Sequence, residues 1–477
     1  MENDKYITPL SGRYPSEEMN RLWSNDSRYS TWRRLWVALA ETEKELGINI
    51  TDEQLDEMRQ NIYNIDYDIV AKREKECRHD VMAHVYEFGL KCPKAKPIIH
   101  LGATSCYVTD NTEVILMSKA LELIKQKLIL IISNLKEFAL RYKNVACLGY
   151  THFQPAQLTT VGKRATLWIQ DLLEDLDELN FVQNNLKLLG CKGTTGTQES
   201  FMKLFKDAEK VKQLDEKIAE KIGIDNVYMV SGQTYTRKQD SRVLNLLAQI
   251  AQSCSKFAND MRLLQHEKEL EEPFEKNQIG SSAMAYKRNP MRCERINSLS
   301  RHVIALTMDA EMTAATQWLE RTLDDSANRR ICISESFLAV DAILILYANI
   351  SQNIVVYENV IKTNLKQELP FMATEEILMN AVLKGGDRQE LHEKIRIHSM
   401  EAGKQVKEFG NKNDLVERIA EDTAFGLTKE EIEMELNPNR LCGIAPNQVE
   451  EFINTKVNPI LEEYKNISID LNIEVNV

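Results

Sequence analysis

The stretch 114–138 reads VILMSKALELIKQKLILIISNLKEF, and its apolar residues recur in steps of three and four. This spacing places a single apolar stripe along one face of a helix. The average step of about 3.5 residues is the period at which long helices pack side by side in a bundle. The stripe consists of Val114, Met117, Leu121, Ile124, Leu128, Ile131, Leu135 and Phe138. The stretch therefore predicts one long helix of a helical bundle.

Three other stretches show the same pattern, at 172–189, 243–264 and 333–347. Four such stripes in one chain predict a long antiparallel helix bundle. Glycine (18) and proline (11) are scarce among the 477 residues, which favours long, uninterrupted helices over turns and strands. We therefore expect an all-α fold.

The regions on either side of the bundle have a different character. Residues 1–104 contain shorter helical stretches with polar breaks, and short helices again follow residue 356. Capping-box patterns at Asp110-x-x-Glu113 and Thr428-x-x-Glu431 predict two helix starts. We expect three helical domains, 1–104, 105–356 and 357–477.

Charge and cysteine content exclude several classes of protein. The formal net charge is −12 and no block of basic residues is present, so a nucleic acid polymer is not an expected partner. The nine cysteines are scattered singly, which is typical of buried thiols in a reducing compartment and predicts neither disulfides nor a zinc site. The most apolar stretch, 337–350, is too short to cross a membrane, and the N-terminus has no signal-peptide pattern. We expect a cytoplasmic protein without a membrane or metal partner.

One segment in the middle of the chain carries no apolar stripe. Residues 278–289 read QIGSSAMAYKRN, and Pro290 follows. Gly280 permits unusual backbone angles, and Asn289-Pro290 fits the start of a helix. A helix start offers free N–H groups and a positive dipole, which suit a carboxylate. We predict a polar loop that brings Lys287 to this helix start; an ordinary connecting loop is the alternative.

Two further segments are candidates for a functional site. In Thr151–Gln157, THFQPAQ, a histidine precedes Gln154-Pro155, which fits a helix start. We therefore expect the ring of His152 to lie near a helix N-terminus, where neutral imidazole is favoured. The segment His100–Ser105, HLGATS, precedes a predicted long helix, and on its own it is a weak signal because Thr and Ser there are usually caps.

Together the three segments resemble the motifs of the fumarase/aspartase superfamily. The loop is similar to the pattern GSSxMPxKxNP, with Ala285 where the pattern has proline. The 151–157 segment is similar to the motif TH-x-Q-PAQ without a departure. Thr104 and Ser105 match positions that contact substrate in this superfamily. The segments occur in the order expected for the superfamily, between residues 100 and 290.

Other segments are similar to the branch of this superfamily that acts on succinylated purine nucleotides. Arg13-Tyr14 resembles its phosphate-contacting start, and 78–84, RHDVMAH, resembles its nucleotide-contacting region. The segments 231–235, 287–292 and 321–330 complete the set. The resemblance implies substrate-binding roles for Arg13, Tyr14, Arg78, Asp80, Thr104, Ser105, Thr151, Gln233, Asn289, Arg295, Arg321, Ser326 and Arg330.

The resemblance implies a β-elimination that releases fumarate from a small anionic nucleotide. Ser281 is the implied base, and His152 is the implied acid that protonates the leaving nitrogen. Lys287 is expected to stabilise the carbanion, and His79 is expected to orient the substrate. A serine base needs nearby positive charge and exclusion of water, which closure of the loop could provide. No cofactor is expected.

The predicted site residues are spread along long antiparallel helices, which argues against a site within one chain. The resemblance implies a homotetramer in which each active site draws residues from three subunits.

Two alternatives remain open. Another lyase of the superfamily, acting on argininosuccinate, fumarate or aspartate, would share the three central segments, and only the resemblance of 13–14 and 78–80 favours a nucleotide. A non-catalytic protein built on the same scaffold would have no evident need for Ser281, His152 and Lys287 together.

Overall fold

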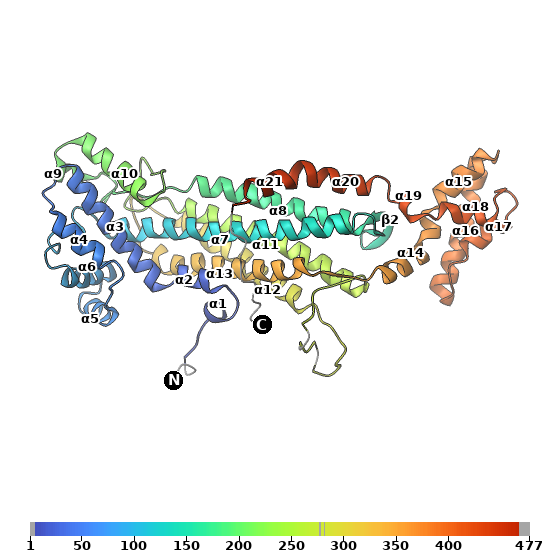
Figure 1. Ribbon diagram of the computed structural model, residues 1–477, viewed down its shortest axis with the longest axis horizontal. Helices are drawn as coiled ribbons and strands as arrows, with labels where there is room; N and C mark the ends of the chain where they lie inside the picture. Colours follow the sequence, from blue (N-terminus) through green and yellow to red (C-terminus); the bar gives the residue numbers. More distant parts are fainter. Residues whose placement is uncertain (1–4, 276–277, 281, 467–477) are drawn as a thin grey trace.

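The computed structural model describes residues 5–275, 278–280 and 282–466. Five long helices form a rod-shaped bundle with a smaller helical region at each end (Figure 1). They are α7 (Ser105–Arg141), α8 (Val161–Asn184), α11 (Lys238–His266), α12 (Met291–Thr316) and α13 (Asp325–Gln352). The expected all-α fold is confirmed, with the addition of two small two-stranded antiparallel sheets. The strands are β1 (Ala146–Thr151) with β2 (Gln154–Thr160), and β3 (Leu270–Glu271) with β4 (Val355–Val356).

One end of the rod is built mainly from the N-terminal helices. They are α3 (Asn25–Glu45), α4 (Asp52–Gln60), α5 (Tyr67–Cys77) and α6 (Asp80–Lys91), whereas α1 (Pro9–Gly12) and α2 (Glu17–Leu22) lie along the side of the bundle (Figure 1). Two short helices of the central region, α9 (Glu199–Phe205) and α10 (Ala208–Ile222), lie at the same end (Figure 1). The apolar residues of this end belong to the same buried cluster as those of the bundle, so the two parts share one core.

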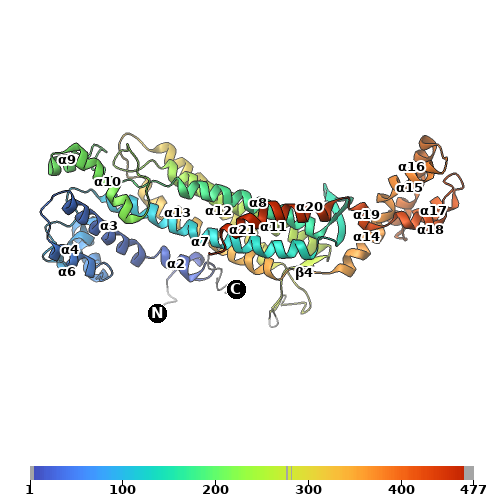
Figure 2. The same cartoon turned by 45° about the horizontal axis from the view of Figure 1, so that its top comes forward.

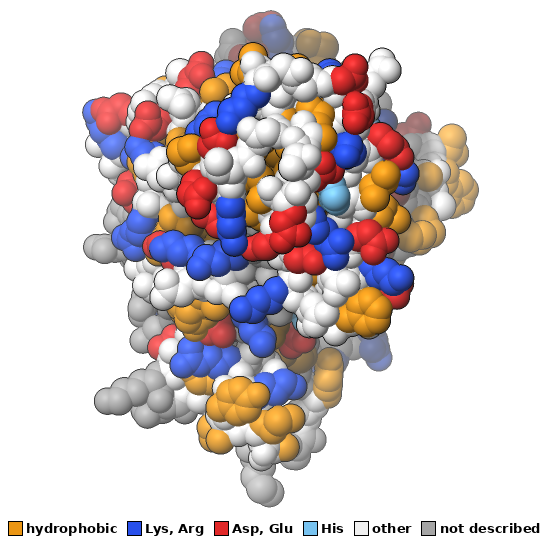
Figure 3. Space-filling model, turned by 90° about the vertical axis from the view of Figure 1, so that its right-hand side faces the viewer, with side chains coloured by type: hydrophobic (Ala, Val, Ile, Leu, Met, Phe, Trp, Pro, Cys, Tyr) orange, Lys and Arg blue, Asp and Glu red, His pale blue; other side chains and the backbone are white. Residues whose placement is uncertain are grey.

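The opposite end is a C-terminal lobe with a core of its own, built from apolar residues between 373 and 432. Its helices are α14 (Glu358–Met372), α15 (Thr374–Leu383), α16 (Arg388–Phe409), α17 (Leu415–Glu421), α18 (Lys429–Glu435) and α19 (Pro438–Leu441). The predicted capping box at Thr428 and Glu431 is confirmed at the start of α18. Acidic and basic side chains are interspersed on the end face of the lobe (Figure 3).

The chain then returns from the lobe to the bundle. Helix α20 (Ala445–Phe452), a π-helical turn (Ile453–Val457) and α21 (Asn458–Glu463) lie along α8 (Figure 2). Val449, Ile453 and Val457 are buried in the main core. The three-domain division with boundaries at 104 and 356 stays a prediction.

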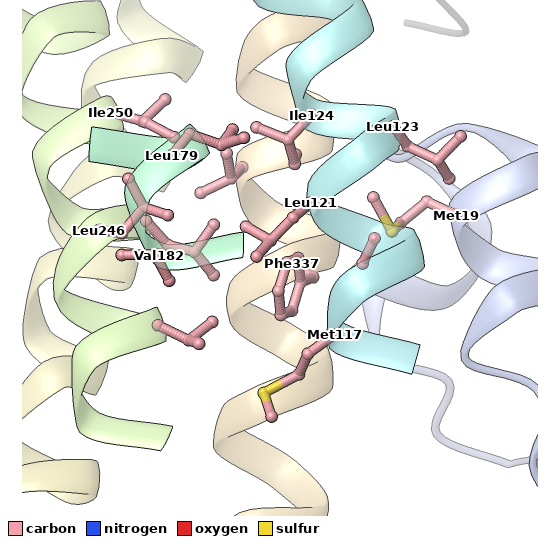
Figure 4. Packing of buried hydrophobic residues seen from close by; sticks show 14 of the residues in the cluster. Met19, Met117, Leu121, Leu123, Ile124, Leu179, Val182, Leu246, Ile250 and Phe337 are labelled. Carbon is pink, nitrogen blue, oxygen red and sulfur yellow. The ribbon is translucent and has the colours of Figure 1, made fainter. Parts of the chain in front are cut away.

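The four predicted apolar stripes form the centre of the bundle. Figure 4 shows side chains from α7, α8, α11 and α13 meeting in one layer. In that layer Leu121, Leu179, Leu246, Ile250 and Phe337 are fully buried. Burial of each large apolar side chain contributes about 1.5–3 kcal/mol. The core is therefore a continuous seam along the rod, as the spacing of the stripes predicts.

Helix α13 is apolar on nearly all sides because it lies in the middle of the bundle. It is long and apolar enough to cross a membrane by length and composition alone, but 78% of its most apolar window is buried inside the protein. Asp341, which interrupts this apolar stretch, is fully buried. Its carboxylate is 2.8 Å from the Lys127 ammonium and accepts the Ser16 N–H at 2.7 Å. The buried charge therefore ties α13 to α7 and to the N-terminal segment.

The predicted start of α7 at a capping box of Asp110 and Glu113 is wrong. The helix begins at Ser105 with Thr104 as N-cap, and both carboxylates are buried within it. Asp110 pairs with Arg237 and Glu113 with Arg28. Two acidic residues three apart are equally typical of a cap and of a pair of buried ion-pair partners, and only the tertiary contacts distinguish the two.

Helix α3 carries another buried carboxyl, that of Glu43. Its side chain is fully buried, and neither oxygen has a hydrogen-bond partner within the described part of the chain. Burial raises the pKa of Glu43 to about 8 from its ordinary value of 4.5. The folded chain therefore holds a proton there that the unfolded chain releases at much lower pH.

We expect Glu43→Gln to stabilise the protein at pH 8 and to change its stability less at pH 5. Because the folded state binds the extra proton between pH 4.5 and about 8, stability falls as pH rises through this window, by at most about 1.4 kcal/mol per pH unit from this group. Urea midpoints of both proteins across this range measure the effect. Glu18→Gln, at an exposed position on α2, is the control. A stability difference between Glu43→Gln and wild type that is constant with pH would contradict the prediction.

Candidate active site

The turn between α5 and α6 presents three adjacent polar side chains. Arg78 ends α5 in the left-handed backbone conformation (φ 55°), which is uncommon for a residue other than glycine. His79 then caps α6, since its Nδ1 accepts the Met82 N–H at 3.4 Å. Asp80 begins α6, and one of its carboxylate oxygens accepts the Val81 N–H at 2.8 Å. Strained backbone of this kind is concentrated at functional sites.

The start of α7 lies opposite this turn. Ser105 Oγ is 3.3 Å from Nε2 of His79. Because Nδ1 of His79 accepts a helix N–H, its proton is on Nε2 and is donated toward Ser105. Behind them, His100 has a positive φ (65°), and its Nδ1 accepts the indole N–H of Trp36 at 2.9 Å. Burial lowers the pKa of His100 to about 4, so its ring is neutral at physiological pH.

The start of α13 forms the third side of the site. Arg321 precedes the helix and contacts the thiol of Cys106, and Ser326 and Arg330 lie in its first turns. Arg330 pairs with Asp80 at 2.8 Å. Burial raises the pKa of Cys106 to about 12, so this thiol is not ionised at neutral pH. The helix dipole and the two arginines make this side of the site positive.

A buried network of charged groups joins three long helices under the site. Arg237, just before α11, is 2.9 Å from Asp110 of α7 and 2.6 Å from Asp325 of α13. Arg329 of α13 is 2.7 Å from Asp240 of α11. Tyr235 is shared, because its hydroxyl donates to Asp240 at 2.6 Å and accepts from Arg329 at 2.7 Å. Burial alone would lower the pKa of Arg237, but the adjacent Asp110 raises it above its ordinary value.

These three sides and this floor enclose a cavity of about 940 Å³. Nine predicted site residues line it, namely Arg78, His79, Asp80, Thr104, Ser105, Gln233, Arg321, Ser326 and Arg330. Six arginines and five carboxylates contribute to the wall, and this small excess of positive charge suits an anionic ligand. The volume is in the range of small-molecule sites.

Sequence reasoning missed other residues of this pocket. They include Arg28, Tyr29, Trp32, Glu74, His100, Asp110, Glu113, Arg237, Asp325 and Arg329. His100, Asp325 and Arg329 lie inside the predicted motif segments 100–105 and 321–330. Treating every polar residue of these two segments as a candidate would have included them. Arg28 and Glu74 lie in regular amphipathic helices, and no local signal separates them from ordinary surface charges.

The predicted residues Arg13, Tyr14 and Arg295 do not line this pocket. They form a separate cluster, in which the guanidinium carbons of Arg13 and Arg295 lie 5.8 Å and 5.4 Å from the centre of the Tyr14 ring. Burial lowers the pKa of Arg295, and the positive charge of Arg13 acts in the same direction. Two neighbouring cations around one ring also suit an anion.

The expectation that His152 lies beside a helix start is wrong. Gln154–Thr160 forms strand β2, and His152 and Phe153 are the two residues of the hairpin turn between β1 and β2. Both have positive φ, 51° and 55°, which is required by the favoured two-residue hairpin turns but disfavoured for these side chains. Thr151 is the last residue of β1. The strained turn presents His152 at the tip of the hairpin, exposed to solvent.

The loop before α12 also differs from expectation. Ser281 lies outside the described residues. Gly280 is needed for close contact and not for its backbone angles, since a Cβ there would lie 2.1 Å from the Lys287 carbonyl oxygen. Asn289 does not cap α12, and its amide instead donates to the Gly280 carbonyl at 2.6 Å. Lys287 is exposed at the surface of this chain.

The predicted free helix start is occupied by the protein itself. The carboxylate of Glu272 is buried and accepts the N–H groups of Arg292 and Cys293 at 3.1 and 3.0 Å. Burial raises the pKa of Glu272, and these two hydrogen bonds oppose that rise. These N–H groups of α12 are therefore not available to a substrate carboxylate.

The long helices keep the three groups of predicted residues apart. Helix α7 has 37 residues and is about 55 Å long at about 1.5 Å per residue. It separates the pocket at Ser105 from the hairpin that follows its far end. Helix α12, with 26 residues, similarly places about 39 Å between the loop and Arg321. In two views the hairpin and the loop project from different sides of the bundle (Figures 1 and 2).

Comparison with known families gives two matches along the chain. A family model described as Lyase matches residues 4–305, and one described as Adenylosuccinate lyase C-terminus matches residues 370–452. The expected membership of the superfamily is thereby confirmed.

Relatives and solved structures agree with this assignment. The adenylosuccinate lyase of Saccharomyces cerevisiae is 52% identical over 99% of both chains, and that of Schizosaccharomyces pombe is 49% identical over 99% of both. A 3-carboxy-cis,cis-muconate lactonizing enzyme from Pseudomonas putida has the same fold, with a TM-score of 0.81 and 19% identity over 93% of this chain and 98% of that one. A fumarate lyase from Mesorhizobium gives a TM-score of 0.80 at 19% identity, over 94% of this chain and all of that one. The chain is therefore an enzyme of the adenylosuccinate lyase family.

Proposed function

We propose that this lyase removes fumarate from adenylosuccinate by β-elimination and leaves AMP, and that it also acts on the succinylated aminoimidazole-carboxamide ribotide of purine biosynthesis. The observation that carries the proposal is the arginine-rich pocket at the start of α13 in a chain that matches adenylosuccinate lyases over its whole length. Both substrates carry a phosphate and two carboxylates, and the pocket offers arginines suited to such groups.

The phosphate is bound at the start of α13. Arg321, Ser326 and Arg330 are grouped around the positive end of a 28-residue helix. A helix N-terminus with two guanidinium groups and a hydroxyl is a strong site for a dianion. Arg13 and Tyr14, supplied by another subunit, complete this subsite. Arg78, Asp80, Thr104, Ser105 and Gln233 hold the rest of the nucleotide.

The elimination requires a base, a stabilised carbanion and an acid. Ser281 takes a proton from the carbon beside one carboxylate, and the electron pair becomes the double bond of fumarate as the C–N bond breaks. His152 gives its proton to the leaving nitrogen. Lys287 and Asn289 stabilise the negative charge on the succinyl group, and Arg295 binds a carboxylate. His79 positions the substrate through its Nε2–H.

The active site is shared between subunits of a homotetramer. Helices of about 40 to 55 Å separate the pocket from the hairpin and from the loop in one chain. Neighbouring antiparallel bundles would bring the pocket of one subunit to the hairpin of a second and the loop of a third. The loop and hairpin expose apolar side chains that such neighbours would cover, including Tyr286 (88% exposed) and Phe153 (48%).

The enzyme works in the cytoplasm. All nine cysteines are free, and eight of them are buried. This distribution is consistent with a reducing compartment and with the interpretation of the cysteines as small buried hydrophobic residues.

The purified enzyme is expected to release fumarate from adenylosuccinate and from the succinylated ribotide, and not from argininosuccinate. The two nucleotides offer the phosphate that the α13 subsite binds, and argininosuccinate has none. Fumarate release followed by ultraviolet absorbance measures all three reactions. Turnover of argininosuccinate alone would contradict the proposal and favour another lyase of the superfamily.

Ser281→Ala and His152→Ala are each expected to lower kcat about 100- to 10,000-fold, because each removes a proton-transferring group. Circular dichroism should show unchanged helix content for both variants, which separates loss of chemistry from loss of folding. Ser399→Ala and His392→Ala, on α16 in the C-terminal lobe, make the same chemical changes away from the site and should keep full turnover. Near-normal kcat for Ser281→Ala would show that another group is the base.

Mixing Ser281→Ala and His152→Ala subunits is expected to restore activity. If the two residues come from different subunits, a random equal mixture regains both native groups in roughly a quarter of its sites. The measurement is turnover after subunit exchange, with hybrid tetramers confirmed by native mass spectrometry. Mixing Ser281→Ala with the double variant is the control and should recover nothing. Confirmed hybrids that stay inactive would rule out the shared site.

A further inference from the structure

Most arginines around the pocket already have a carboxylate partner in the same chain. Among the six arginines of the wall, four form such ion pairs. These are Arg28 with Glu113, Arg237 with Asp110 and Asp325, Arg329 with Asp240, and Arg330 with Asp80. In the first three the side chains are at most 18% exposed, so these pairs belong to the rigid wall and floor.

The pair of Arg330 and Asp80 is different because it faces solvent. The Arg330 side chain is 61% exposed and that of Asp80 28% exposed, and the two are 2.8 Å apart. Water screens such a pair, so it contributes little free energy and can open without leaving a buried charge behind. Arg330 is also one of the groups that surround the proposed phosphate subsite on α13.

Asp80 stays in position when Arg330 leaves it. One oxygen of its carboxylate accepts the Val81 N–H at 2.8 Å in the first turn of α6, and the other accepts from Arg330. The positive end of the helix dipole also attracts a negative charge at this position. A fixed negative charge therefore remains next to any anion that Arg330 binds.

We propose that Asp80 is an internal counter-ion that competes with the substrate phosphate for Arg330. Binding of the nucleotide exchanges the carboxylate of Asp80 for the phosphate, and release of the product restores the Asp80–Arg330 pair. The inference rests on the proposed function in placing the phosphate at Arg330. Asp80 then lowers the affinity of the site for the phosphate group. The product AMP is bound less tightly as a result.

The proposal predicts an effect opposite to that of an ordinary binding residue. Asp80→Asn removes the charge and keeps an oxygen that can accept the Val81 N–H. If Asp80 competes for Arg330, the variant binds phosphate more tightly, by about two- to fivefold in Kd, the value of one exposed ion pair. If Asp80 only holds the site in shape, the variant binds phosphate equally or more weakly.

The test is calorimetric titration of the full-length enzyme with inorganic phosphate and with AMP at constant ionic strength. We expect Asp80→Asn to lower Kd for both probes. Glu74→Gln is the matched control. Glu74 also contributes a carboxylate to this pocket, from α5, but the carboxylate that pairs with Arg330 is that of Asp80. It should change Kd by less than about twofold. Equal tightening in Glu74→Gln would mean that net charge, and not exchange at Arg330, sets the affinity.

A second comparison tests whether the effect of Asp80 on phosphate binding depends on Arg330. Arg330→Gln should weaken phosphate binding, and adding Asp80→Asn to that variant should change Kd no further. A further gain in the double variant would overturn the proposal, as would an unchanged or raised Kd in Asp80→Asn alone. If Asp80→Asn does not fold, Asp80→Ser serves in the same way, since its hydroxyl can also accept the Val81 N–H.

Failure of this inference is distinguishable from failure of the proposed function. Phosphate and AMP titrations need no turnover, so they report on Asp80 even in a preparation that releases no fumarate. Conversely, normal fumarate release from adenylosuccinate with no effect of Asp80→Asn would leave the proposed function standing and remove only the counter-ion role. Where the enzyme releases fumarate and Asp80 competes for Arg330, AMP should also be a stronger competitive inhibitor of Asp80→Asn than of the wild type.

Discussion

The structure depends on the buried ion network that joins α7, α11 and α13. Asp110, Arg237 and Asp325 meet from three different helices, and Arg329, Asp240 and Tyr235 add a second set of bonds beside them. A repeating apolar stripe does not by itself fix how two helices align along their length, whereas a buried charge without its partner costs about 3–5 kcal/mol. The network therefore sets the register of the bundle at one end. The pocket lies directly on it.

The length of the helices then decides where chemistry can occur. Each connection between long helices lies at one end of the rod, so successive motifs alternate between the ends. The segments at 100–105, 231–235 and 321–330 meet at the pocket end, and those at 151–157 and 278–290 lie at the other. The two ends cannot meet within one chain, because the buried core is continuous along the rod. This separation is the observation behind the proposal that several copies share each site.

Charge pairing within the chain controls which cationic groups a ligand can use. Glu272 occupies the start of α12, and three buried pairs hold Arg28, Arg237 and Arg329. These groups shape the site and are not available to a substrate. Arg330 is held by an exposed pair with Asp80. The difference in burial therefore distinguishes the arginines that form the pocket wall from an arginine that could exchange its carboxylate partner for a ligand.

The sequence by itself determined the helical bundle, its four stripes and nine of the residues that line the pocket. Apolar spacing of 3.5 residues is a local property, and the segments similar to known motifs could be matched residue by residue. Only the tertiary structure decided the role of Asp110 and Glu113 inside α7, the capping of α12 by Glu272 and the hairpin that carries His152. In each case the deciding contact is with a residue distant in sequence or depends on strand pairing. A carboxylate or a histidine looks the same along the chain whether it caps a helix, pairs with a buried arginine or sits in a strained turn.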